Sequence, residues 1–374
     1  MYLSTLKLTK FRNYDSGLLN FHPAVNAIVG LNGMGKTNIL DAIYYLCFGK
    51  SYFSAGDRYV VKDDGDFFRI SGIFEDEKDV TDVTVKCRAG IKKDIEVLGK
   101  KIDKISEHIG RFLCVILAPN DIQLMMDGSE DRRNFLNNTI VQTDKRYLEA
   151  LIKYTHLLKQ RNSLLKIFAE TKTFDETLLE AITAGMYDPA AYIHEKRSRQ
   201  ISQMLPFFDQ LYSEISGGSE KCSILYKSQL DEGNLKELMT RNAGNDKILA
   251  RTSQGIHKDD LIFSLNSEPL KNYASQGQLK SFIIALKLTQ YKIIEYNSGK
   301  KPLILLDDIF DKLDQKRVTQ LLTLLMGQNF GQIFITDTNE DRIKIVLEAV
   351  KTTYILHKIV SGNIFSDGLQ HSNM

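Results

Sequence analysis

The stretch Gly30-Leu31-Asn32-Gly33-Met34-Gly35-Lys36-Thr37 decides the fold of this chain. It fits the phosphate-binding loop pattern G-x-x-x-x-G-K-[ST], and its flanks fit as well. The apolar run 25–29 predicts a buried strand before the loop. Apolar residues at helical spacing over 38–48, with Gly49 as a stop, predict a helix after it. A strand, a glycine loop and a helix point a row of backbone N–H groups at an anion.

The last two residues of the loop have separate expected roles. Lys36 would reach the β- and γ-phosphates of a nucleotide, and the Thr37 hydroxyl would hold Mg²⁺. The alternative is a glycine-rich turn with a surface lysine. A chance match in a chain of this length has a probability on the order of one per cent at average glycine usage, so the pattern favours the nucleotide site.

Composition excludes several other classes of protein. The 374 residues suffice for two or three domain-sized units, and 43% hydrophobic with 26% charged residues is typical of a soluble globular protein. No apolar run approaches the ~20 residues that span a bilayer, and the N-terminus shows no secretory signal. Four scattered cysteines predict reduced thiols in a cytoplasm. A net charge of +2 gives no argument for nucleic acid, so any such site must be a local patch.

The order of predicted elements indicates an α/β chain with a helical insertion. The first hundred residues are rich in strand patterns, and the apolar run 112–117 predicts a central strand. Helical patterns then dominate, over 130–168, 175–184 and 189–215. After Gly255 the alternation resumes, with a helix over 276–295, a strand over 303–306, a helix over 315–326 and a strand over 332–336. We predict one discontinuous nucleotide-binding lobe over 1–125 and 256–374, with a helical lobe over 126–255 between its parts.

Two carboxylates follow the strand predicted over 303–306. Asp307, at the end of a strand beside the phosphate loop, could hold the hydration shell of Mg²⁺. Asp308 would then lie where it could accept a proton from the attacking water. The alternative is a pair of solvated loop acids.

Ser275-Gln276-Gly277-Gln278 opens the helix that precedes that strand. Ser275 is a good N-cap, and Gly277 allows a close approach of the backbone to a ligand. These features predict a second anion site. The alternative is a capped helix with no ligand.

A resemblance emerges from the order of these motifs. A phosphate loop, then S-Q-G-Q, then an apolar strand ending in Asp-Asp, then Leu313-Asp314, resembles the ABC-type ATPases, and among them the RecF family of DNA repair and replication proteins. Further stretches resemble that family, among them 10–14, 119–122, 131–136, 158–166 and 255–261. The resemblance spans residues 1 to about 340, and is weakest over 216–250. It implies an ABC-type ATPase head of mixed α/β structure.

The resemblance also implies a mechanism that spacing alone could not show. Family members dimerise head to tail on two ATP molecules, each lying between one subunit's phosphate loop and the other's signature loop. Carried over, Ser275, Gln276, Gly277 and Gln278 would contact the partner's γ-phosphate, with Asp314 at the same interface. Arg12 and Asn13 would lie near the phosphates or ribose, and Gln123 is a candidate for the glutamine at the lobe junction.

The chain departs from many ABC-type ATPases after the strand over 332–336. Where those enzymes carry a switch histidine, this chain has Thr336 and Thr338. We therefore expect slow hydrolysis, on the order of minutes per turnover, well below the ~10 s⁻¹ median of enzymes.

Two clusters of basic residues are candidates for DNA binding. The first has eight members against two acids, namely Arg132, Arg133, Lys145, Arg146, Lys153, Lys159, Arg161 and Lys166. The second consists of Lys92, Lys93, Lys100, Lys101 and Lys104. Such side chains could bind phosphates with a salt-dependent affinity, although solvated helix faces and hairpin tips would have the same composition. The resemblance implies binding to DNA gaps, junctions or single strands, partners of the RecR and RecO type, help in loading recombinase, and SOS induction.

Other functions of the same phosphate loop remain open. A long-armed SMC protein would place hundreds of heptad residues between loop and signature, whereas about 240 residues separate Lys36 from Ser275 here. A transporter ATPase usually has L-S-G-G-Q and a switch histidine. A small-molecule kinase would need an arginine-rich lid and would not need Ser275-Gln276-Gly277. Dimerisation that depends on ATP would favour a RecF-type ATPase over a small-molecule kinase.

Overall fold

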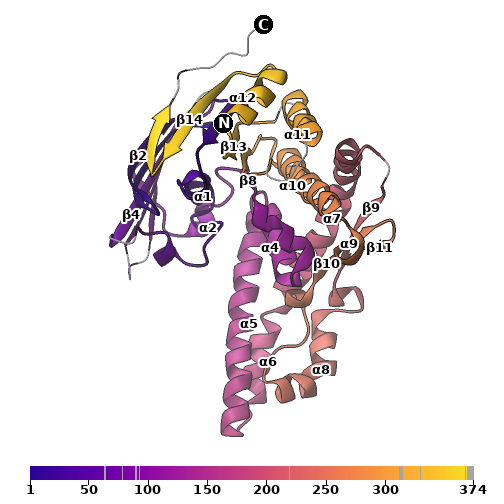
Figure 1. Cartoon of the computed structure of the whole chain (residues 1–374). Coiled ribbons are helices and arrows are strands. Elements are labelled where there is room, and N and C mark those ends of the chain that lie inside the picture. The colour runs from indigo at the N-terminus through magenta and orange to yellow at the C-terminus, as the bar shows by residue number, and fades with distance from the viewer. Residues whose placement is uncertain are drawn as a thin grey trace. The chain divides into compact units, whose positions relative to one another are not determined.

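The computed structural model divides the chain into two compact units (Figure 1). It describes residues 1–62, 65–77, 79–88, 91, 93–218, 220–310, 315–328, 330–366 and 368. Unit 1 comprises Met1–Asp121 and Ser281–Met374, and unit 2 comprises Ile122–Lys280. The first boundary lies four residues before the expected one, and the second lies 25 residues after it. Residues 256–280 belong to unit 2 because strand β10 (Asp260–Leu265) pairs with β9 (Cys222–Lys227).

The first sheet of unit 1 is an antiparallel sheet of six strands in the order β2-β1-β4-β5-β6-β7. Its strands are β1 (Tyr2–Phe11), β2 (Tyr14–Asn20), β4 (Phe67–Glu75), β5 (Val80–Arg88), β6 (Asp94–Val97) and β7 (Lys100–Lys101). In β4, buried and more exposed side chains alternate along the strand. This alternation is the pattern of a sheet with one face on the core.

The second sheet of unit 1 has the order β15-β14-β3-β13-β12-β8, and its five strands from β14 to β8 are parallel. Its strands are β3 (Val25–Val29), β8 (Cys114–Leu117), β12 (Leu303–Leu306), β13 (Ile333–Asp337), β14 (Tyr354–Val360) and β15 (Asn363–Ser366). All residues of β3, β8, β12 and β13 are buried, which explains their continuous apolar runs. The strands predicted at 25–29 and 303–306 are confirmed.

Helix α1 (Lys36–Phe48) contacts strands of both sheets, so the core of unit 1 surrounds it (Figure 1). Of its 13 residues, 11 are buried, and Gly49 ends it in the left-handed conformation. Unit 1 also holds α2 (Ile105–His108), α11 (Gln315–Gly327), α12 (Glu340–Ala349) and the larger part of α10 (Gln276–Ser298). The helices predicted after the phosphate loop and over 315–326 are confirmed.

Unit 2 is mainly helical, as Figure 1 shows for the long helices α5 and α7. Its helices are α3 (Gln123–Met126), α4 (Ser129–Ile140), α5 (Lys145–Thr171), α6 (Glu176–Ala184), α7 (Tyr187–Ser216), α8 (Leu235–Leu249) and α9 (Leu270–Tyr273). The segment 130–168, which is helical in pattern, belongs to two helices, because Asp144 caps α5 by accepting a hydrogen bond from Tyr147 N at 2.9 Å. The stretch 216–250 supplies β9 and α8. Strand β10 lies between β9 and β11 (Glu268–Pro269).

Among the residues that the structure describes, four 3₁₀ turns are also found: Asp57–Tyr59, Pro119–Ile122, Gln229–Asp231 and Ile256–Lys258. In the part of the chain that the structure describes, no helix combines the length and apolarity that crossing a bilayer requires.

Two buried arginines hold unit 2 together. Arg161 pairs with Asp246 at 2.7 Å and also donates to the hydroxyls of Thr183 and Thr252. Arg197 pairs with Asp259 at 2.6 Å, and Tyr226 and Ser228 donate to the same carboxylate. Both arginines are only 2% exposed. Arg161 is therefore a structural residue, and its place in the proposed DNA-binding cluster was wrong.

Replacing Arg161 by Met is expected to lower the free energy of unfolding by about 3–5 kcal/mol, because Asp246 would remain as a buried charge without its partner. The neighbouring Lys159 is exposed and serves as the control, with an expected change for Lys159→Met within about 0.5 kcal/mol. Chemical denaturation of both variants measures the difference. Equal stabilities would contradict the structural role of Arg161.

Candidate nucleotide site

Strand β3 and helix α1 hold the loop Gly30–Thr37 at the carboxyl edge of the second sheet. Gly30 and Gly35 have φ values of 155° and 112°. A Cβ on Gly35 would lie 2.5 Å from Asn13 Nδ2, and one on Gly30 would collide with the Ile359 carbonyl. Only glycine fits these two positions, so the spacing of the motif follows from the packing around the loop.

The Lys36 ammonium lies across the loop. Its Nζ donates to the carbonyl oxygens of Gly30 at 2.7 Å and Leu31 at 3.1 Å. Burial lowers the pKa of Lys36, and the nearby carboxylates Asp308 and Asp307 oppose that shift. The two carbonyls hold the cation where phosphate oxygens can replace them.

The tip of the loop faces outward. Leu31 is 70% exposed, and Asn32 and Gly33 are also exposed. Met34 is tied to the β14–β15 turn, since its thioether accepts a hydrogen bond from Ser361 N at 3.1 Å. The loop is thus fixed at its base and at Met34, and open at its tip.

Asp307 joins the loop to the two neighbouring strands. Thr37 Oγ1 lies 3.0 Å from both carboxylate oxygens of Asp307, and Thr336 Oγ1 donates to Oδ1 at 2.8 Å. Burial raises the pKa of Asp307, while these two hydroxyls lower it. A hydroxyl and a carboxylate so close together are the hard oxygen ligands that Mg²⁺ prefers, so the residues present fit that ion.

Asp308 follows in the left-handed conformation, with φ of 45°. Its backbone N–H donates to Thr336 Oγ1 at 2.8 Å. Thr336 therefore contacts both acids of the Asp-Asp pair. Parallel strands bring β3, β12 and β13 to one edge, and this topology places Lys36, Thr37, Asp307 and Asp308 in one site.

Comparison with known proteins adds to this geometry. The family model described as RecF/RecN/SMC N terminal domain matches residues 2–361. The DNA replication and repair protein RecF of Flavobacterium johnsoniae is 40% identical over 354 residues, which cover 95% of this chain and 99% of that protein. The chain belongs to the RecF family. A second relative, the protein of the same name from Porphyromonas gingivalis strain W83, is 40% identical over 367 residues, with 98% and 100% of the two chains covered.

Solved structures agree with this membership. The recombination mediator protein RecF-ATPrS, of the RecFOR pathway, superposes with a TM-score of 0.88 at 30% identity over 98% of each chain. An Smc head domain from Pyrococcus furiosus shares the fold alone, with a TM-score of 0.56 at 16% identity over 99% of this chain and 96% of that one. These likenesses confirm the expected ABC-type head with a helical lobe. RecF-family membership places the chain among ATP-binding proteins of DNA replication and repair.

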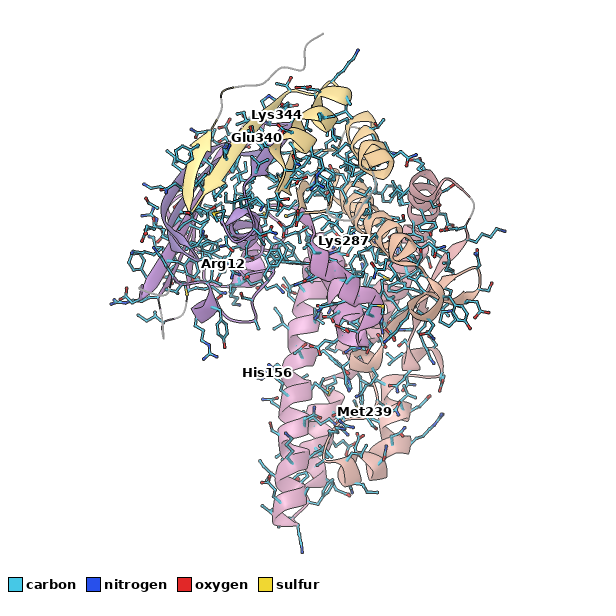
Figure 2. All side chains as sticks on the ribbon, viewed as in Figure 1. Arg12, His156, Met239, Lys287, Glu340 and Lys344 are labelled. Atoms are coloured by element: carbon cyan, nitrogen blue, oxygen red, sulfur yellow. The ribbon has the colours of Figure 1, made fainter. Side chains whose placement is uncertain are left out.

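In this RecF-family chain, the turn between β1 and β2 supports the phosphate loop. Asn13 Nδ2 donates to Met34 O at 2.9 Å, and Asn13 Oδ1 accepts from Asn38 at 2.7 Å. The Arg12 guanidinium, which is labelled in Figure 2, instead binds Asp41 of α1, with Nε 2.9 Å from Oδ2. It also donates to the hydroxyls of Ser51 and Ser54. Asn13 thus contacts the loop itself, whereas Arg12 reaches it through α1.

The signature segment of this RecF-family chain begins α10 in unit 2. Ser275 Oγ accepts from Gln278 N at 3.3 Å, and Gln278 Oε1 accepts from Ser275 N at 2.7 Å. This reciprocal pair is a capping box, which confirms Ser275 as the N-cap. Ser275 and Gln276 are exposed, and Gly277 and Gln278 are half-buried. Asp314 lies outside the described residues, and Gln123 is an exposed residue that begins α3.

Three residues of the site were not named as site residues from sequence. Tyr14 donates to Gly35 O at 3.0 Å, Asp41 holds Arg12, and Thr336 binds the Asp-Asp pair. The signal available for Asp41 was an acid within the apolar pattern of the predicted helix, and the structure shows this acid to be fully buried. Thr336 had been noted only as the residue in place of a histidine.

The basic residues divide into paired and exposed groups. Arg132 binds Asp260 at 2.6 Å, and Arg133 donates to Asp259 O at 2.9 Å, so both serve unit 2 itself. The exposed members of the first cluster are Lys145, Arg146, Lys153, Lys159 and Lys166, all on α5. In the second cluster, Lys93 pairs with Asp57 and Lys101 with Asp94, Lys100 and Lys104 are exposed, and Lys92 lies outside the described residues.

Proposed function

We propose that this protein is a slow ATP hydrolase that closes as a head-to-tail homodimer on two ATP molecules and binds DNA in that state. One observation carries the proposal: the glycine loop and the exposed start of α10, which each suit an anion, lie in different units of the chain. Unit 1 supplies the loop Gly30–Thr37 with Asp307, and unit 2 supplies the segment Ser275–Gly277, of which Ser275 and Gln276 are exposed. ATP that contacts both would favour the dimer by those differential contacts.

The residues of unit 1 would each have a separate role at the triphosphate. Lys36 would exchange its two carbonyl partners for β- and γ-phosphate oxygens. Thr37 and Asp307 would hold Mg²⁺, which neutralises developing phosphate charge when bound. Asn13 would keep the loop in place, and Arg12 would act on it through Asp41. Asp314 is proposed to lie at the dimer interface.

Asp308 is proposed as the general base for water. A carboxylate there can accept the proton of the attacking water, while Thr336 fixes its backbone. Since a threonine replaces the switch histidine, turnover on the order of minutes is expected. A measured turnover above about one per second would contradict this part of the proposal.

Asp308→Asn is expected to trap an ATP-loaded dimer. An amide of the same shape cannot take up the proton, so hydrolysis should fall by a factor of roughly 10²–10⁴, while ATP binding persists. Sedimentation after ATP addition, followed over hours, should show a dimer that outlasts the wild-type one. Glu340→Gln, an acid on α12, is the control. A variant that hydrolyses ATP at the wild-type rate would remove Asp308 from this role.

The oligomeric state tests the proposal as a whole. Native mass or light scattering should show a monomer without nucleotide and a dimer with ATP and Mg²⁺. A chain that stays monomeric with saturating ATP would refute the head-to-tail assembly.

DNA binding is proposed for the exposed face of α5. Lys145, Lys153, Lys159 and Lys166 are exposed along this helix. His156 projects from the same helix (Figure 2). Exposed cations on a helix suit phosphates and give salt-dependent binding without sequence preference. The substrates proposed by family membership are gapped, junction and single-stranded DNA.

The double variant Lys153→Glu/Lys159→Glu is expected to weaken DNA binding and to reduce the slope of log affinity against log salt by about two, one for each lost phosphate contact. A salt series with the ATP-bound dimer measures this slope. Lys236→Glu, an exposed site on α8, is the matched control. If the slope of log affinity against log salt is unchanged, α5 is not the DNA-binding surface.

Partners are proposed from the family alone. The similar solved protein is a recombination mediator of the RecFOR pathway. We propose RecR- and RecO-type partners, help in loading recombinase on gapped DNA, and a contribution to SOS induction.

A further inference from the structure

Both the oxygen and the nitrogen of the Gln278 side-chain amide form hydrogen bonds. Its Oε1 accepts from Ser275 N at 2.7 Å, and its Nε2 donates to Glu220 Oε1 at 2.8 Å. An amide has one acceptor end and one donor end, so the carboxylate of Glu220 decides which end faces Ser275. If the amide turned over, its NH₂ group would face the N–H of Ser275, donor against donor.

Glu220 is itself held in place. Its other oxygen, Oε2, accepts from Tyr212 O–H, near the end of α7. Glu220 is half-buried and stands just before β9. The chain of contacts Tyr212–Glu220–Gln278–Ser275 therefore runs from a buried ring on α7 to the N-cap residue of α10.

The capping box leaves specific donors unused at the start of α10. It occupies the N–H groups of Ser275 and Gln278 and the acceptor side of Ser275 Oγ. Within the described residues, no hydrogen bond is found from the N–H groups of Gln276 and Gly277, as expected for the first turn of a helix. The Ser275 O–H also remains able to donate. The described residues thus show no acceptor for three donors at the start of α10, namely the N–H groups of Gln276 and Gly277 and the Ser275 O–H.

We infer that Glu220 is a positioning residue for the signature segment, and that Gln278 shapes this segment instead of binding phosphate. Glu220 orients the Gln278 amide, the amide fixes the N–H of Ser275, and the three remaining donors keep the directions that a γ-phosphate requires. This inference rests on the proposed head-to-tail function and narrows its phosphate contacts to Ser275, Gln276 and Gly277.

The test compares two substitutions at Glu220. Glu220→Ala removes the acceptor. It is expected to weaken dimerisation on the slowly hydrolysed analogue ATPγS roughly 100-fold, because the dimer contains two such segments and each loses about tenfold, the effect of one charged hydrogen bond. Glu220→Gln keeps a carbonyl for Gln278 Nε2 and should stay within about threefold of wild type. Glu268→Ala, an exposed acid on β11 of the same unit, is the matched control.

Sedimentation gives the dimerisation constants, and titration with fluorescent nucleotide gives ATP affinity at concentrations where the protein is monomeric. Glu220→Ala is expected to keep the wild-type ATP affinity and melting temperature. Only its dimerisation affinity should fall. Should Glu220→Ala not fold, Glu220→Thr, which also lacks an acceptor at this reach, gives the same measurement.

Three outcomes would overturn the inference: a Glu220→Ala dimer as strong as wild type, a Glu220→Gln dimer as weak as Glu220→Ala, or a loss that follows melting temperature and ATP affinity together. The last is what a merely structural role predicts. A wild-type protein that stays monomeric with ATPγS would instead refute the proposed head-to-tail function.

Discussion

Ser275→Arg is expected to leave ATP binding intact and to abolish dimerisation on ATP. The arginine removes the Ser275 O–H, breaks the capping box with Gln278, and fills the exposed space where a partner's γ-phosphate would lie. The nucleotide loop in unit 1 keeps all of its own residues. Because the dimer contains two such segments, losing about 1.5–3 kcal/mol at each predicts a dimer weakened at least about 100-fold.

Sedimentation with and without ATPγS measures this effect, alongside a nucleotide titration of the same preparation. Ser223→Arg, at an exposed position on β9, controls for the added charge in unit 2. If Ser275→Arg forms dimers with ATPγS as wild type does, the signature segment does not face the triphosphate, and the head-to-tail arrangement fails.

Lys36→Ala is expected to abolish nucleotide binding. Lys36 is 6% exposed, and its ammonium is the cation that the loop carbonyls hold. Without it, the triphosphate would be buried beside Asp307 and Asp308 with no neutralising side chain from the loop. A loss of about 3–5 kcal/mol for one partner of such a pair predicts an affinity reduced roughly 100-fold or more.

Titration with fluorescent nucleotide tests this, with the melting temperature as a check on folding. Lys7→Ala, on an exposed position of β1, is the control and should bind as wild type does. An ATP affinity for Lys36→Ala within a few fold of wild type would show that the nucleotide lies elsewhere.

Local sequence was sufficient for the nucleotide loop and its two flanking elements. The positions of Gly30, Gly35, Lys36 and Thr37 follow from steric and hydrogen-bonding rules that act over a few residues. The strand at 25–29 and the helix that ends at Gly49 are equally local. Ser275 was predicted as an N-cap for the same reason, since capping depends on residues three apart.

Local patterns failed where charged residues change role with burial. Arg161 lies among exposed lysines in the sequence, yet its face of α5 turns toward Asp246, 85 residues away. Composition alone groups Arg161 with Lys159 and Lys166, because the sequence does not show which basic side chain will be buried. The division at 280 instead of 255 has a similar cause, since the pairing of β9 with β10 joins two stretches that the pattern treats separately.

The amino-acid sequence was sufficient on its own to predict the family, the phosphate loop and the pair Asp307–Asp308, because each motif consists of adjacent residues. The folded structure alone decided that Thr336 would bind that pair, that Asp41 would hold Arg12, and that Glu220 would orient Gln278. Each of these contacts joins residues 29 or more positions apart. Such pairings arise from sheet order and helix packing, which set distances that no short window of sequence contains.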